Sequence, residues 1–189
     1  LKGLKMRIPG LGGKVLAKAG GTPILLAGGE IYTALERGTI DATEWVGPFH
    51  DKRLGLHQAA KYYYYPGWPE PGTTLELIVN RNAWAELPED LQKIVTVAAR
   101  SVNQDIFSQL EVLNIKALQE LKAEKTVAVL AFPPEALKEL KRLTSETLDE
   151  EAAKNASFKK VYEAYKTFQA DNAAWNAISD DAYSGALKP

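Results

Sequence analysis

The segment GGEIYTALERGTIDATEW, residues 28–45, predicts a helix followed by a strand and largely decides the fold class. Apolar residues in its first part recur at the spacing of one helical face, and Gly38 is typical of a helix C-terminus. These apolar residues are Ile31, Ala34 and Leu35. The run over residues 40–46 is expected to form a strand. It carries a carboxylate beside an indole, Glu44 and Trp45, where another helix is expected to begin.

The residues before this segment repeat the same alternation. Residues 5–10 and 21–27 are short apolar runs bounded by Gly and Pro, which is typical of buried strands, and a helix of modest length fits between them. Alternating strands and helices at these spacings predict βαβ units around a parallel sheet. The expected fold class is therefore α/β.

Two further extended segments, residues 62–68 and 73–80, are rich in β-forming residues and are separated by turn-forming residues. Apolar residues then recur at steps of three and four over residues 88–125, which predicts one long helix of roughly 55 Å. A helix of that length exceeds the width of a small domain, so we expect it to cross between two bodies or to bend.

The last third of the chain is predicted to be mostly helical. Residues 126–132 are expected to form a strand, and a helix with Pro at its start follows. A final helix over residues 157–179 carries an aromatic stripe that is expected to face a partner surface. The stripe consists of Phe158, Tyr162, Tyr165, Phe168 and Trp175.

Composition excludes several classes of protein. The 189 residues include 23 basic and 24 acidic side chains, with a net charge of −1 and no basic block, so no nucleic-acid-binding surface is predicted. There is no Cys, which excludes thiol nucleophiles, disulfides and Cys-based zinc sites. No apolar stretch approaches the roughly 20 residues that a membrane-spanning helix needs.

The common catalytic and nucleotide-binding motifs are also missing. The glycine-rich residues 10–15 fail the phosphate-loop pattern, because Ile8 replaces its first Gly and Val15 replaces its Ser or Thr. His50 and His57 do not form a His-Glu-x-x-His pattern, and there is no Gly-x-Ser-x-Gly nucleophile elbow.

Three positions have both a functional and a structural interpretation. Arg7, within an apolar strand, could pair with an anionic ligand or could be an exposed residue or part of a structural ion pair. Glu44 stands at a strand end, where ligands of parallel sheets bind, and could hold a hard cation while Trp45 walls an apolar ligand face. The alternative is a solvated Glu44 beside a core Trp45.

The tyrosine run at residues 62–65 would place alternate rings on opposite faces of a strand. One face could line a cleft, with Trp68 and Glu70 on the following loop. The alternative is a sheet face packed under helices.

Several of these stretches together resemble one family, the DctP-type substrate-binding proteins of tripartite ATP-independent periplasmic (TRAP) transporters. The resemblance is carried by LKGLKMRIPG at residues 1–10, by residues 28–45, and by YYYYPGW followed by LIVN. The stretch ATEWVGPFHD, residues 42–51, is similar to the branch that binds 2-oxo or hydroxy monocarboxylates with a metal ion.

The resemblance implies a periplasmic, non-enzymatic receptor in which two α/β lobes clamp a small organic acid. By position in the motifs, Arg7 would pair with the ligand carboxylate, and Trp45, Tyr65 and Trp68 would also contact the ligand. A bridging sodium or calcium ion would be held by Glu44, the Trp45 carbonyl and Glu70. The implied partners are TRAP transporter membrane subunits and a second copy, joined through the C-terminal helix.

Family members have a complete first lobe before the LKGLKMR strand, so the resemblance implies that this chain is the C-terminal portion of such a protein. The expected organisation is a second ligand-binding lobe at residues 1–72, a crossing strand and long helix at 73–115, a return to the second lobe at 116–140, and C-terminal helices with a dimerisation element at 141–189.

Two other functions remain open from the residues themselves. An enzyme could use His50 and Asp51 for acid–base chemistry, although no nucleophile or cofactor motif accompanies them. A helical interaction module without a ligand could assemble through the long helix and the aromatic terminal helix.

Overall fold

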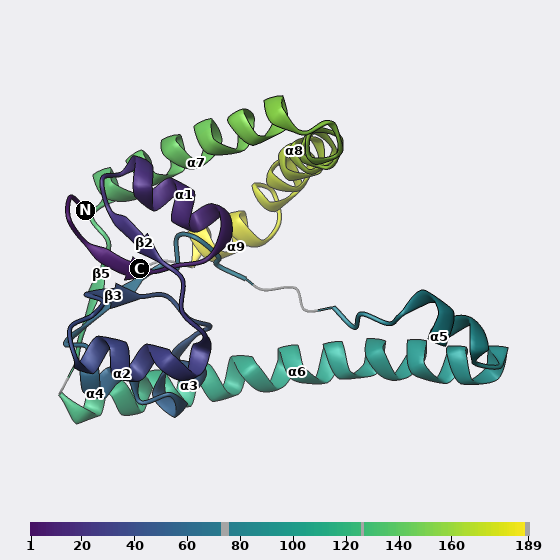
Figure 1. The fold of residues 1–189 in the computed structure, drawn as a ribbon, viewed down its shortest axis with the longest axis horizontal. Helices are drawn as coiled ribbons and strands as arrows, with labels where there is room; N and C mark the ends of the chain where they lie inside the picture. Colours follow the sequence, from purple (N-terminus) through teal and green to yellow (C-terminus); the bar gives the residue numbers. More distant parts are fainter. Residues whose placement is uncertain (73–75, 126, 188–189) are drawn as a thin grey trace. The chain divides into compact units, whose positions relative to one another are not determined.

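The computed structural model describes residues 1–72, 76–125 and 127–187, which divide into two compact units, 1–137 and 138–189. The first unit contains both sheets (Figure 1). Its elements are β1 (Lys5–Arg7), α1 (Gly10–Lys18), β2 (Thr22–Ile24), the short 3-10 helix η1 (Gly28–Glu30), α2 (Ile31–Glu36), β3 (Ala42–Thr43), α3 (Pro48–Arg53), α4 (Leu56–Ala59), β4 (Tyr62–Tyr65), α5 (Arg81–Glu86), α6 (Glu89–Glu124) and β5 (Ala128–Ala131).

Both sheets are parallel, as the alternation of strands and helices predicts. The first has the order β2-β1-β3, with Arg7 opposite Ile24 on one side and Thr43 on the other. The second pairs β4 with β5. Helix α1 packs against β2, and α2 packs against β3. The expected α/β class is therefore confirmed.

One core cluster of the first unit is built mainly from residues 28–45. The predicted helical face, Ile31, Ala34 and Leu35, is buried, and it packs with Ile40 and Leu56. Gly38 has φ +68°, a left-handed conformation that other residues rarely adopt, so it ends α2 and turns the chain into β3.

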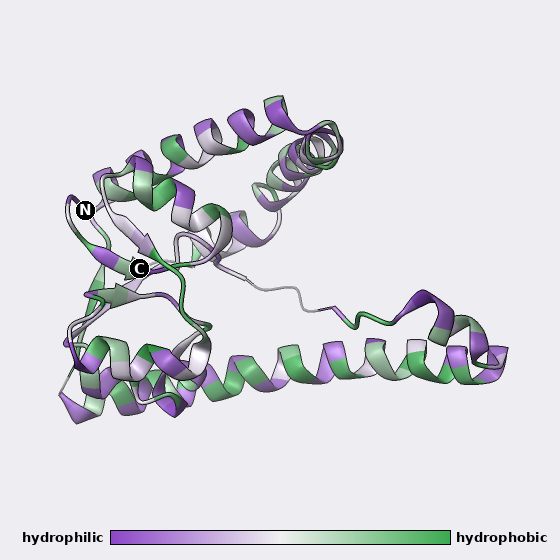
Figure 2. Cartoon of the chain, viewed as in Figure 1, coloured by the Kyte–Doolittle hydropathy of each residue, from purple (hydrophilic) through white to green (hydrophobic). Residues whose placement is uncertain are grey.

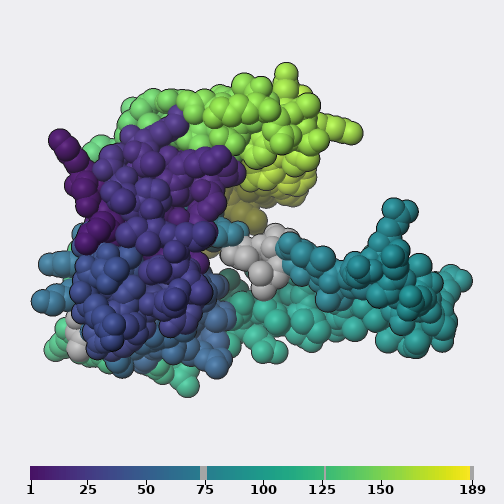
Figure 3. Space-filling view, in the orientation of Figure 1, coloured from purple at the N-terminus to yellow at the C-terminus, as the bar shows by residue number. Residues whose placement is uncertain are grey.

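Helix α6 confirms the predicted long helix, with 36 residues. Its C-terminal part lies along α3, where Lys52 donates to Glu120 and Glu124 at 2.8 and 2.6 Å. Near its N-terminal end, the Gln92 side chain donates to the carbonyl oxygens of Trp84 in α5 and of Leu87, which follows α5, at 3.0 and 2.9 Å. Figure 3 shows α5 and this part of α6 in teal. Within the described ranges, none of the helices combines the length and apolar character of a membrane span.

One expectation needs correction. The predicted extended segment at 73–80 forms no strand at residues 76–80, and residues 73–75 lie outside the described residues. A strand needs a neighbouring strand for its backbone hydrogen bonds, and no described segment pairs with residues 76–80. The predicted final helix, residues 157–179, corresponds to α8, which ends slightly earlier, at Asn176, and a further helix begins beyond the predicted range, at Asp180.

The second unit is helical. It contains most of α7 (Pro134–Lys154), which starts in the first unit, followed by α8 (Ala156–Asn176) and α9 (Asp180–Ala186). Asn155 caps the start of α8, because its side chain accepts from the Phe158 amide at 3.0 Å. The predicted aromatic stripe lies on α8, and Tyr165, Phe168 and Trp175 are each more than half exposed.

Replacing Leu121 by Ala should lower the free energy of unfolding by about 2–5 kcal/mol, because Leu121 is 1% exposed on the part of α6 along α3 and its loss leaves a cavity. Leu91→Ala is the matched control, since Leu91 lies on the same helix but is 41% exposed, and should cost under about 1 kcal/mol. Urea denaturation measures both values. Equal losses would contradict the packing described for α6.

Candidate functional site

Arg7 and Glu44 form an ion pair at the carboxyl ends of two neighbouring strands. Arg7 is the last residue of β1, and Glu44 directly follows β3. Arg7 Nη1 donates to Glu44 Oε1 at 2.6 Å, and Arg7 Nε donates to the Leu26 carbonyl at 3.2 Å. The two charged side chains are only 11% and 17% exposed. Arg7 therefore has a partly buried anion partner within the chain, and Glu44 is not a fully solvated surface residue.

Trp45 joins this pair from the core side. Its indole packs against the cluster around Ile31, and the Arg7 guanidinium carbon lies 5.4 Å from the centroid of its ring. Such a distance allows a favourable cation–π contact. Gly28 lies directly against the indole, since a Cβ atom there would be 2.8 Å from Trp45 Cη2. The position of the indole is thus set by the backbone at Gly28 and by the Arg7 side chain.

The electrostatics around Glu44 favour an additional positive charge. Burial raises the pKa of the Glu44 carboxyl above its usual value; Arg7 opposes this increase, and the negative charges of Glu70 and Asp51 add to it. The negative charges of Glu70 and Asp51 thus act on Glu44, whose ion-pair partner is Arg7. A cation at this point would offset their mutual repulsion.

The other predicted site residues are placed less closely. Glu70 lies within electrostatic range of Glu44. Tyr65 ends β4 and is 51% exposed, and Trp68 is partly buried on the loop that follows. No hydrogen bond, ion pair or ring contact connects Tyr65 or Trp68 with Arg7 in the described part of the chain. Their contact with a ligand stays a prediction.

Asp51 has a structural environment that the sequence reasoning missed. It is 9% exposed, and its Oδ2 accepts from the Tyr63 hydroxyl at 2.6 Å. Burial raises the pKa of Asp51, against the effect of this hydrogen bond, and burial beside Asp51 also raises the pKa of Tyr63. The available signal was an acidic residue in the first turn of a helix that starts with Pro48.

The donor set fits a hard cation. The Glu44 carboxylate, the backbone carbonyl of Trp45 and the Glu70 carboxylate supply only oxygen atoms, which sodium and calcium prefer. Among the residues that the structure describes, no three His, Cys, Asp or Glu side chains gather into a cluster that could hold a metal. Any such ion would therefore need the backbone carbonyl and ligand oxygens as well as carboxylates.

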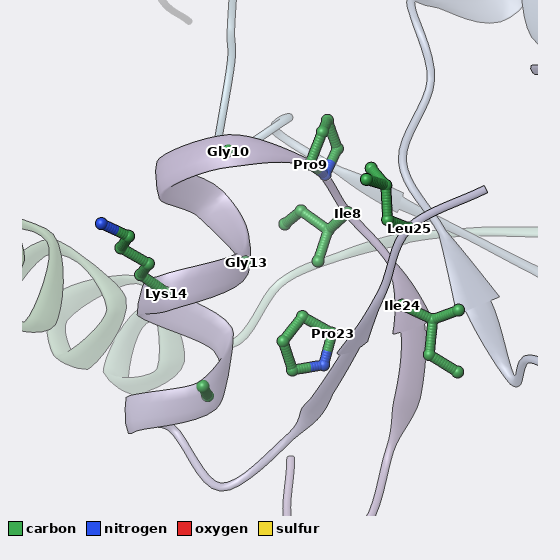
Figure 4. A pocket seen from close by; sticks show the side chains of 9 residues that line it. Ile8, Pro9, Gly10, Gly13, Lys14, Pro23, Ile24 and Leu25 are labelled. Atoms are coloured by element: carbon green, nitrogen blue, oxygen red, sulfur yellow. The ribbon is translucent and has the colours of Figure 1, made fainter. Parts of the chain in front are cut away.

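A shallow hollow of about 310 Å³ is lined by residues of α1, of β2 and of the segment between β1 and α1. Figure 4 shows Ile8 and Pro23 between α1 and the neighbouring strands, while the Lys14 side chain points away from them. Its lining is mainly apolar and includes no carboxylate. The hollow is therefore not the predicted acid-binding site, although Ile8 follows Arg7 in the chain.

The sequence profile of one family, described as bacterial extracellular solute-binding protein, family 7 (DctP), matches residues 1–155. The chain belongs to this family. The predicted recognition and the extracytoplasmic location are thereby confirmed at the level of the family, and so is a non-enzymatic role, because the family binds solutes. The hypothesis of acid–base catalysis by His50 and Asp51 is accordingly dropped.

Three DctP-family relatives are especially similar. The monocarboxylate 2-oxoacid-binding periplasmic protein of Nostoc sp. (strain PCC 7120) is 47% identical over 183 residues, which are 97% of this chain and 50% of that protein. A TRAP periplasmic solute-binding protein from Pseudoalteromonas atlantica T6c, solved with bound sodium and pyruvate, is 45% identical with a TM-score of 0.93. The match covers 100% of this chain and 57% of that one.

The third is a TRAP transporter solute-binding protein from Bordetella bronchiseptica RB50, 38% identical with a TM-score of 0.94 over 98% of this chain and 55% of that one. It was solved as a mixed-occupancy dimer with copurified calcium and picolinate in one active site. This DctP-family chain thus spans about half the length of these relatives. Relatives carrying sodium or calcium with an organic acid agree with the predicted cofactor class.

Replacing Gly28 by Ala should displace the Trp45 indole, because the added methyl group would lie 2.8 Å from its ring. We expect a loss of about 1–3 kcal/mol in the free energy of unfolding from overpacking. Gly29→Ala is the control, since nothing lies within 4 Å of a Cβ atom at that position. Urea denaturation of both variants tests the contact, which would be contradicted if Gly28→Ala were as stable as Gly29→Ala.

Proposed function

We propose that this chain supplies the second lobe of an extracytoplasmic receptor that captures a small 2-oxo or 2-hydroxy carboxylate and delivers it to the membrane subunits of a TRAP transporter. The observation that carries the proposal is the partly buried pair of Arg7 and Glu44 at the carboxyl ends of β1 and β3. An arginine fork next to a carboxylate combines a group that binds an acid with a group that binds a cation.

Arg7 would recognise the ligand carboxylate. Its Nε and Nη1 already donate to Leu26 and Glu44, and these two bonds hold the guanidinium plane in one orientation. A guanidinium fixed in this way presents its remaining N–H groups in a fork that matches a carboxylate, whereas a Lys ammonium is a point charge. Trp45, stacked near the guanidinium, would exclude water from one side of the ligand.

Glu44, the Trp45 carbonyl and Glu70 would hold the cation, sodium or calcium. When bound, the ion would supply the positive charge that lets a ligand carboxylate approach Glu44. Support comes from the raised pKa of Glu44, to which Glu70 contributes, and from the relatives that carry sodium with pyruvate or calcium with picolinate.

The decisive experiment is calorimetric titration of pyruvate, 2-oxobutyrate and lactate into this chain fused to a first lobe from the Pseudoalteromonas relative. In sodium-free buffer containing a divalent-ion chelator we expect no binding heat, and addition of sodium or calcium should restore it. Binding that is independent of cations would contradict the role of Glu44. Absence of binding under every condition would favour a helical interaction module instead.

Conservative variants separate the two roles in the same titration. Arg7→Lys keeps the charge but loses the fork, and should raise the Kd for pyruvate by roughly tenfold or more. Glu44→Gln should weaken the dependence on the cation. Glu89→Gln is the matched control, because Glu89 is an exposed residue that pairs with Lys93 on α6. Removing either partner of the pair altogether would leave a partly buried charge without its partner and would destabilise the fold, which is why Ala variants are avoided.

We also propose that α8 forms a homodimer contact. Val161, Tyr165, Phe168 and Trp175 lie on one face at helical spacing, and each is more than half exposed. Apolar side chains at steps of three, four and seven residues form a surface suited to a second helix. The Bordetella relative, described as a dimer, is consistent with this arrangement.

Phe168→Glu should convert the dimer to a monomer, because a charge would be buried in the apolar contact. Ala170→Glu adds the same charge on the opposite face of α8, where the side chain is also exposed, and should leave the dimer intact. Light scattering over a range of protein concentrations gives the mass of each variant. If both variants keep the mass of the unchanged chain, α8 is not the contact.

A further inference from the structure

Three side chains fix the backbone that follows Glu44 and Trp45. Two of them accept from its amides, and the third binds one of these two. Asp51 supplies the first contact: its Oδ1 accepts from the amides of Val46 and Gly47 at 3.3 and 3.1 Å. These amides precede α3 directly, where no carbonyl of the helix backbone can accept from them. The Asp51 carboxylate therefore fixes the backbone that follows Trp45.

The contact with Val46 bears directly on the Trp45 carbonyl. The carbonyl of Trp45 and the N–H of Val46 belong to one planar peptide unit, in which the two groups point in opposite directions. Because Asp51 binds the Val46 N–H, it also sets the direction of the Trp45 carbonyl. A backbone carbonyl cannot rotate out of the plane of its peptide unit. The direction of the C=O bond therefore depends on the hydrogen bond that the neighbouring N–H makes.

Tyr63 holds Asp51 in turn. Its hydroxyl donates to Asp51 Oδ2 at 2.6 Å, so the two carboxylate oxygens have separate tasks. Tyr63 lies on β4, in the second sheet, whereas Asp51 lies on α3 after the first sheet. This hydrogen bond thus links the Glu44–Trp45 segment to the strand that leads to Tyr65, Trp68 and Glu70.

Asn114 supplies a third contact, from α6. Its Oδ1 accepts from the Phe49 amide at 3.0 Å, and a Cβ atom at Gly47 would lie 3.3 Å from that same oxygen. Asn114 therefore lies against the turn between Trp45 and α3. Asp51, Tyr63 and Asn114, here called the anchoring cluster, together bind three amides within four residues.

We propose that the anchoring cluster positions the Trp45 carbonyl and Glu44 for cation and ligand binding, an inference that rests on the proposed function. The three residues are positioning residues, since they act through the backbone and through Asp51. A plain helix cap would need Asp51 alone. Recruiting Tyr63 from a second sheet and Asn114 from α6 ties the orientation of the binding segment to the two elements on either side of it.

The test uses Tyr63→Phe, which removes only the hydroxyl, and Tyr64→Phe as its matched control. Tyr64 is the next residue on β4, is 46% exposed and packs its ring near Phe132. Asn114→Ala removes the acceptor of the Phe49 amide. Asn114→Asp should restore this hydrogen bond, because a carboxylate also accepts from an amide at a helix N-terminus. Two readouts apply. The first is amide hydrogen exchange at Val46, Gly47 and Phe49 without ligand, and the second is the Kd for pyruvate with calcium in the fused protein.

Tyr63→Phe and Asn114→Ala should each accelerate exchange within the set Val46, Gly47 and Phe49. Each should also raise the Kd by roughly tenfold, the loss expected for one hydrogen bond to a charged or oriented group. Tyr64→Phe and Asn114→Asp should change neither. Faster exchange with an unchanged Kd would overturn the positioning role, and so would unchanged exchange. Failure of the unchanged fused protein to bind pyruvate would instead overturn the proposed function, and the exchange rates would still report whether the cluster holds the segment.

Discussion

The partly buried ion pair between Arg7 and Glu44 is the constraint on which the rest of the candidate site depends. Two charges that are mostly removed from water are tolerated only when each has a partner, so β1 and β3 must end side by side. Parallel pairing with the β2-β1-β3 order satisfies this requirement. The guanidinium then determines where the Trp45 indole lies, and the indole in turn closes the core above Ile31.

The sequence was informative where structure follows from local periodicity. The buried face of α2, the stop at Gly38, the parallel sheets and the length of α6 were all predictable from spacing and turn residues. The contacts that shape the site were not, because they join distant residues: Arg7 to Glu44, Tyr63 to Asp51, and Asn114 to Phe49. A local pattern carries no signal for such pairs.

Residues 76–80 and α6 also show that local sequence patterns do not predict contacts with distant residues. The composition of residues 76–80 favours an extended conformation. A strand also needs a neighbouring strand to pair with, and the described residues contain none for this segment. Periodicity predicts α6 correctly but does not say which part is covered. Leu121 is buried near α3, whereas Ile94, Val97 and Phe107 are each more than 60% exposed on the same helix, where Figure 2 shows hydrophobic residues along its length.

The contact between Gly28 and Trp45 has a consequence for other members of the family. Because the indole occupies the space that any side chain at position 28 would fill, the two positions cannot change independently. A DctP-family protein with a larger residue at the position of Gly28 would need a smaller side chain at the position of Trp45. The two sites, 17 residues apart in sequence, should therefore vary together among relatives, and their joint identity would distinguish receptors that present an indole beside the arginine from those that do not.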